Sequence, residues 1–182
     1  MNYDQLIKNW HTKASDEDYF SKYVFVYLAL IAFLKKKKFT NTRCDREAIQ
    51  KLKRDNAVKN RYLEKVFSNA LVRKSWENII DELNRVRLGN VSRNGNGVEE
   101  IEYWNCSYND WRSKTEEDKQ KPLGVVHNLD DWENMVEFWY SIRNNLFHGG
   151  KDPQDSRDRL LIENGYKTLR PLMEIFIQDL KI

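Results

Sequence analysis

The most apolar stretch of the chain, "YVFVYLALIAFL", runs from Tyr23 to Leu34. Its apolar residues cover every side of a helix, so the pattern predicts a helix that is buried on most sides. Twelve residues are too few to span a bilayer. We expect this first helix to lie at the centre of a bundle, or at a dimer seam where a second subunit covers the remaining face.

Three shorter helical patterns follow before residue 89. "DREAIQKLKR" predicts a polar helix from Asp45 to Arg54, and each of the next two segments repeats apolar residues at steps of three and four. Ser75 is a weak candidate for the cap of the third. The expected apolar positions are Val58, Tyr62, Val66 and Phe67 in the second and Trp76, Ile79, Ile80 and Leu83 in the third.

The segment 89–130 lacks this periodicity. Its Asn94-Gly95 and Asn96-Gly97 pairs are typical of a hairpin or a loop. "SKTEEDKQKP" within it is polar throughout. We therefore expect a long, irregular, loop-rich insertion, of a kind that is often functional in a compact domain.

Two amphipathic patterns complete the chain. The first begins with the acidic pair Asp130-Asp131, and Gly149 and Gly150 are expected to stop the helix. Its apolar stripe consists of Trp132, Met135, Val136, Trp139, Ile142, Leu146 and Phe147. Asp152 is the expected cap of the last helix, from about Ser156 to Leu180, with kinks expected at Gly165 and Pro171. The sum is one all-α domain, residues 1–182: a bundle of about five helices with the insertion before the penultimate one.

Composition narrows the class of protein. The net charge is only +3, but residues 1–98 hold 20 Lys/Arg and 11 Asp/Glu, whereas residues 99–182 hold 11 and 17. A basic half can attract a polyanion such as RNA, but the total excess is small, and from charge alone ordinary solvated helix faces are the favoured explanation. Cys44 and Cys106 show no disulfide or metal spacing, and the N-terminus has no signal-like apolar run. We expect a cytoplasmic protein without a membrane segment.

The usual cofactor and catalytic motifs are missing from the sequence. It contains no phosphate-binding Gly-rich loop, no dinucleotide fingerprint, no HExxH and no G-x-S-x-G elbow. The histidines His11, His127 and His148 have no ligand spacing. We expect neither a metal site nor a cofactor.

One stretch does combine chemically versatile residues, "RNNLFHGGK" from Arg143 to Lys151. Arg143 lies on or beside the apolar stripe, where a charge needs a partner or a function. His148 follows five residues later, about 140° round an ideal helix, so the two side chains converge only through a distorted last turn or a second subunit. The plain alternative is a helix end, at which His148 caps and Arg143 pairs with an acid.

The same stretch resembles the signature of HEPN domains, in which an Arg, four to six intervening residues and a His form the active motif. Here the motif is Arg143, four residues beginning with Asn144, and His148, on the penultimate long helix of an all-α chain. The resemblance implies a HEPN-like bundle and a metal-independent endoribonuclease of prokaryotic defence or toxin systems. It implies a homodimer through the motif helix and the apolar first helix, with RNA as substrate and an antitoxin or defence partner.

These residue types suit that chemistry. His148 can transfer a proton near neutral pH, and Arg143 can hold phosphate oxygens. Asn144 can orient either group, and Asn145 and Lys151 are candidate RNA contacts. Attack by the 2′-OH would leave a 2′,3′-cyclic phosphate. The alternatives are an inactive HEPN-like module that binds RNA, nucleotide or protein, and a purely structural helical protein.

Overall fold

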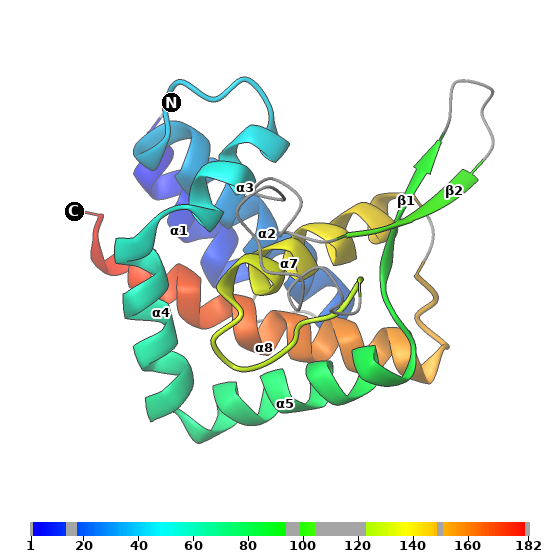
Figure 1. The fold of residues 1–182 in the computed structure, drawn as a ribbon. Helices are drawn as coiled ribbons and strands as arrows, with labels where there is room; N and C mark the ends of the chain where they lie inside the picture. The colour runs from blue at the N-terminus through cyan, green and yellow to red at the C-terminus, as the bar shows by residue number, and fades with distance from the viewer. Residues whose placement is uncertain (1, 14–17, 94–98, 105–122, 149–150, 181–182) are drawn as a thin grey trace, which may run out of the picture.

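A computed structural model describes residues 2–13, 18–93, 99–104, 123–148 and 151–180. This part of the chain is mostly helical (Figure 1), which confirms the all-α class. It holds seven α-helices rather than about five, and one that the patterns did not predict is formed by the polar N-terminus. They are α1 (Tyr3–Lys13), α2 (Tyr19–Phe33), α3 (Asp45–Lys53), α4 (Asn56–Ser68), α5 (Ala70–Arg85), α7 (Trp132–Phe147) and α8 (Ser156–Gln178), and a π-helical turn, η1 (Leu34–Lys38), extends α2.

The apolar helix α2 is the second helix, not the first, and it lies at the centre of the fold. α1 packs along one side of it and α8 along another. Val26, Leu30 and Phe33 are buried there, and the Phe33 ring stacks on Phe176 of α8 at 4.4 Å between centroids. The central position predicted for this helix therefore explains its all-round apolar surface without a second subunit.

Aromatic side chains fill the core between α4, α5, α7 and α8. The indole of Trp76 donates a hydrogen bond to the Tyr62 hydroxyl (2.8 Å), which itself donates to the carbonyl of Thr168 (2.7 Å). The indole of Trp139 donates to the Thr168 hydroxyl (3.0 Å). Each buried polar atom of these rings thus has a partner, which removes the cost of burying it. Phe67, which we expected on the buried face, is 49% exposed.

Two helices are capped by residues other than those that the sequence patterns indicated. α5 begins at Ala70, where the Asn69 side chain accepts from the N–H groups of Leu71 (3.0 Å) and Val72 (3.3 Å). Ser75 is therefore inside the helix and is not its cap. α8 is capped by Asp155 rather than Asp152, because the intervening residues form a turn that is closed by backbone hydrogen bonding between these two aspartates.

Gly165 serves close packing. α8 runs unbroken through Gly165 and Pro171. A Cβ atom on Gly165 would lie 3.0 Å from the ring of Tyr23, whose hydroxyl donates to the carbonyl of Trp139 (2.6 Å). Glycine at this position lets α8, α2 and α7 approach one another.

The described part of segment 89–130 includes a hairpin, one of the two forms predicted. β1 (Gly89–Arg93) pairs with β2 (Glu99–Tyr103) in antiparallel register, with Gly89 opposite Tyr103. The hairpin projects from the helices beside the end of α7 (Figure 1). Residues 94–98 and 105–122, which include the Asn-Gly pairs, lie outside the described residues. No helix in the described part is long and apolar enough to cross a membrane.

Candidate functional site

The predicted motif occupies the last turn of α7. This helix ends at Phe147, and His148 forms its C-cap with φ −92° and its backbone N–H bonded to the carbonyl of Asn144 (3.0 Å). Leu146 still packs against the core, but Phe147 is 58% exposed, so the apolar stripe leaves the core at its last residue. Gly149 and Gly150, the expected stop signals, lie outside the described residues. The motif is therefore at an accessible helix end.

Arg143 is half-buried and loosely partnered. Its side chain is 29% exposed. Its guanidinium donates a hydrogen bond to the Asn144 side chain (3.0 Å) and lies 3.7 Å from the carboxylate of Asp45. The ring centroids of Phe147 and Tyr27 are 4.6 Å and 5.8 Å from its central carbon. Aromatic contact and a long ion pair thus hold the group without using all five of its donors.

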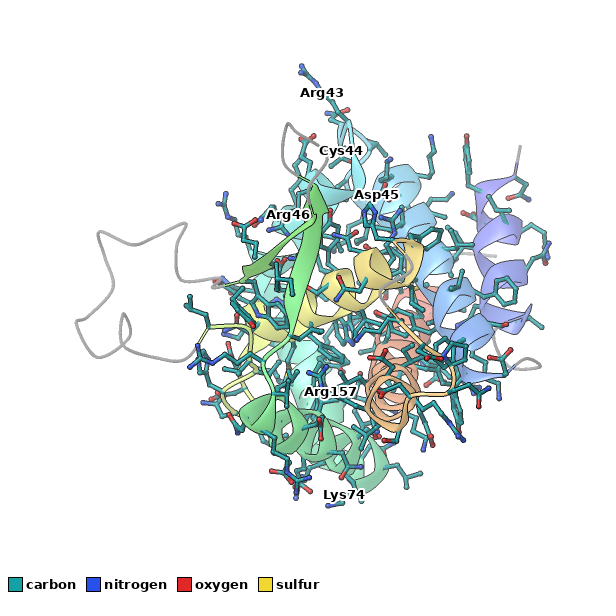
Figure 2. All side chains as sticks on the ribbon, turned by 90° about the vertical axis from the view of Figure 1, so that its right-hand side faces the viewer. Arg43, Cys44, Asp45, Arg46, Lys74 and Arg157 are labelled. Atoms are coloured by element: carbon teal, nitrogen blue, oxygen red, sulfur yellow. The ribbon has the colours of Figure 1, made fainter. Side chains whose placement is uncertain are left out.

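Asp45 is the residue that sequence reasoning missed. It stands on the first turn of α3, and Figure 2 shows it with Arg46 above the ribbon of α7. Lys35 of η1 approaches the same carboxylate more closely than Arg143 does (3.0 Å against 3.7 Å). No local pattern links Asp45 to Arg143, which is 98 residues further on, so only the packing of α3 beside α7 reveals the contact.

Tyr27 closes the inner side of this cluster. Burial raises the pKa of its phenol, and the nearby Arg143 only partly opposes that shift. The hydroxyl has no hydrogen-bond partner in the described part of the chain. The phenol is therefore neutral, and it presents an unused donor beside Arg143.

The three histidines differ in how they are held. His148 is exposed, and no described residue contacts its imidazole through a hydrogen bond or an ion pair. His127, near the other end of α7, is fixed by the carboxylate of Asp131 at 2.7 Å from Nδ1. Burial lowers the pKa of His11. Among the three, His148 is the imidazole that a large external substrate reaches most easily.

Within one chain, Arg143 and His148 are not joined. No hydrogen bond or ion pair between them is present among the described residues, and the helix continues regularly to Phe147. The last turn is thus not distorted in the way that would bring the two side chains together.

The other two predicted RNA contacts have structural partners. The Asn145 side chain is buried and donates to the carbonyl of Gly89 in β1 (2.9 Å), so it ties the hairpin to α7. Lys151 forms a buried ion pair with Asp158 in the first turn of α8. Both side chains are engaged in holding neighbouring segments in place.

A second cluster of charges lies further back on α7. Glu137 is 1% exposed and pairs with the buried ammonium of Lys53 and with the guanidinium of Arg46 (2.6 and 2.8 Å). Burial by itself raises the pKa of this carboxyl, but the two cations outweigh burial and hold the pKa below its usual value. Arg46 also stacks on the ring of Tyr140 (4.8 Å). These ion pairs join α3 to α7 at Glu137, six residues before Arg143.

The described residues contain no group of three or more His, Cys, Asp or Glu side chains that could hold a metal ion. Comparison with known proteins adds no relative: no family model, no curated protein and no solved structure matches the chain. Function must therefore be argued from the residues themselves.

Proposed function

We propose that the protein is a metal-independent endoribonuclease of the HEPN type whose active residues are Arg143, Asn144 and His148. The observation that carries the proposal is the exposed imidazole of His148, which has no partner among the described residues and follows Arg143 by five residues. The guanidinium of Arg143 is itself partly exposed, and its described partners do not use all of its donors. A proton-transfer group and a phosphate-binding group thus lie at the same open helix end, although they do not contact each other within one chain. The resemblance of "RNNLFH" to the family motif adds to this.

The reaction needs little more than these groups, because RNA carries its own nucleophile. His148 takes the proton of the 2′-OH as the 2′-oxygen bonds to phosphorus. Arg143 stabilises the charge on the phosphorane oxygens. The bond from phosphorus to the 5′-oxygen then breaks, and that oxygen takes a proton from an imidazolium or from water. The products are a 2′,3′-cyclic phosphate and a 5′-OH.

Arg143 can turn to a phosphate at low cost. Its pair with Asp45 is long and partly exposed, and such pairs contribute roughly 0–1 kcal/mol. Asp45 would keep Lys35 as a counter-ion at 3.0 Å. No buried charge would be left alone when the substrate displaces the carboxylate.

The separation of Arg143 and His148 in one chain favours a shared site. On an ideal helix, five residues correspond to about 7.5 Å along the axis and about 140° around it. A two-fold axis beside the end of α7 would place the imidazole of one chain opposite the guanidinium of the other. We therefore propose that the active form is a homodimer through α7. The apolar surface of α2 no longer argues for a dimer, because α1 and α8 already cover it within one chain.

Cleavage tests the proposal directly. The purified protein, incubated with tRNA and mRNA in the presence of EDTA, is expected to release fragments with 2′,3′-cyclic phosphate ends. His148→Ala and Arg143→Ala should each lower the rate by about 10²-fold or more. Arg159→Ala, which removes an exposed charge on α8, is the matched control. Equal cleavage by His148→Ala and wild type would overturn the assignment.

The biological setting is part of the same proposal. A ribonuclease of a defence or toxin system should arrest growth when it is induced in a bacterial host without a partner. The His148→Ala variant, produced at the same level, should leave growth unchanged. Equal arrest by both proteins would contradict a toxic role based on cleavage.

The second candidate is a HEPN-like module that binds RNA, nucleotide or protein without cutting. The observation in its favour is that Arg143 already faces Asp45 and that Lys151 is buried against Asp158. Such a module would bind RNA with a steep salt dependence and would release no fragments. The same incubation therefore separates the two candidates.

A further inference from the structure

A groove lies on the other side of the molecule from Asp45 and α3. It runs between the start of α2, the first half of α5 and the middle of α8, and its volume is about 560 Å³. Figures 1 and 2 place α5, with Lys74 labelled in Figure 2, opposite α3 across the fold. The volume is within the ~300–1,000 Å³ of ordinary small-molecule sites.

The charge of the groove is positive, and one cation in it has no ion-pair partner among the described residues. Lys167 pairs with Glu163 (2.6 Å) and Arg170 with Glu174 (3.1 Å). The ammonium of Lys22 instead lies over two tyrosine rings and forms no ion pair with any described carboxylate. An anion entering the groove would meet a positive charge that no described carboxylate pairs with.

Lys22 is also held in place. Its ammonium is 5.1 Å from the ring centroid of Tyr19 and 5.9 Å from that of Tyr166, and the two rings are 5.9 Å apart. Cation–π contact stabilises the position without satisfying the three N–H donors. Lys74, whose nearest carboxylate is Glu77 at 3.8 Å, supplies a second cation on the opposite wall.

The floor of the groove carries polar groups with unused capacity. Ser75 is only 4% exposed as a residue, but its hydroxyl oxygen is not fully buried, and no described residue forms a hydrogen bond with it. Asn78 donates to the side chain of Asn164 (3.3 Å), which leaves the Asn78 carbonyl without a described donor. Because the Ser75 oxygen is not fully buried, a ligand in the groove can hydrogen-bond to it as water does.

The remaining wall is apolar. Leu71 is 80% exposed and lines the groove together with Val72 and Pro171. A flat ring can pack against this wall, and an amide such as that of Asn78 suits the donors and acceptors at the edge of a base. The groove thus combines an anion-binding end, an apolar wall and an amide.

We infer that this groove between α2, α5 and α8 binds one nucleoside phosphate unit, with the phosphate on Lys22 and Lys74 and the base beside Leu71 and Asn78. A free nucleotide and a nucleotide within single-stranded RNA present the same chemistry. The site is separate from the Arg143–His148 end and does not depend on the activity proposed there.

Binding of AMP tests the inference. Amide chemical shifts of the ¹⁵N-labelled chain are followed during titration at low salt with AMP, adenosine and ribose 5-phosphate. AMP is expected to saturate, with the largest shifts at groove residues such as Lys22 and Ser75. Adenosine and ribose 5-phosphate should each bind at least about ten-fold more weakly, because each lacks one recognised part.

Variants locate the site. Lys22→Gln and Ser75→Ala should each weaken AMP binding, the former by about ten-fold or more. Lys65→Gln is the control, since Lys65 lines a neighbouring groove that shares Pro171 and Glu174. The amide spectrum of each variant verifies its fold. Unsaturable AMP binding, equal binding of AMP and ribose 5-phosphate, or equal losses in Lys22→Gln and Lys65→Gln would each overturn the inference.

A further titration distinguishes a free nucleotide from a nucleotide within an RNA strand as the natural ligand. In the His148→Ala background, which removes the proposed cleavage, tetra-adenylate binds more tightly than AMP if the natural ligand is an RNA strand. It binds no more tightly if the ligand is a free nucleotide. AMP binding should be unchanged by His148→Ala itself, so failure of this site and failure of the proposed nuclease are separate results.

Discussion

The two charged clusters of α7 are held in different ways. Glu137 is 1% exposed and contacts two cations, whereas Arg143, less than two turns further on, is 29% exposed and has one carboxylate at 3.7 Å. A buried charge persists only with a full set of partners, while a half-exposed one can exchange partners. We conclude that the inner cluster holds α3 on α7 and that the outer one is available to a ligand.

The largest expected effect is the loss of the inner carboxylate. Glu137→Gln removes the negative charge that pairs with the buried ammonium of Lys53, and the loss of one partner from a buried ion pair costs about 3–5 kcal/mol. The free energy of unfolding in urea measures the loss. Glu64→Gln, at an exposed position of α4, should change it by less than about 0.5 kcal/mol. Similar unfolding free energies for Glu137→Gln and Glu64→Gln would contradict the structural role that we assign to the inner cluster.

Acid should reveal the same cluster. The folded-state pKa of Glu137 is lowered, so its contribution to stability is present above the unfolded pKa of about 4.3 and is lost as pH falls through the folded value. Asp131 has a lowered pKa for related reasons: burial raises it, and hydrogen bonds from His127 and Asn134 outweigh burial. Unfolding free energies between about pH 5 and 3 should fall less steeply in Glu137→Gln than in wild type.

The outer arginine should matter little for folding. Arg143→Ala removes a long, partly exposed ion pair and contacts with two rings, so we expect a loss of about 1 kcal/mol or less in urea unfolding. A loss near that of Glu137→Gln would show that Arg143 is a structural charge and would favour the helix-end interpretation.

The smallest effect is expected for the terminal histidine. His148→Ala removes a side chain with no described partner, and its unfolding free energy should stay within about 0.5 kcal/mol of wild type. Together with a large loss of cleavage, an unchanged stability would assign His148 to function alone. A clear destabilisation would point instead to its role as a helix C-cap.

The sequence pattern located the ends of α7 and α3 closely, because apolar periodicity and acidic first turns are local signals. It failed where a competing local signal existed. Ser75 and Asp152 are of residue types that favour caps, but Asn69 and Asp155, which belong to the same group of residue types, accept the hydrogen bonds that cap α5 and α8. The sequence predicts a kink at Gly165, but glycine is needed there because the ring of Tyr23, on another helix, leaves little room for a side chain.

The candidate site divides in the same way. The sequence alone determined that an arginine, an asparagine and a histidine lie at the end of one helix, since their order and spacing are properties of the chain. Only the tertiary structure decided that Arg143 faces Asp45, that Lys151 is buried against Asp158, and that His148 has no described partner. The physical reason is distance along the chain: partners and burial depend on which helices pack together, and periodicity within one helix carries no information about its neighbours.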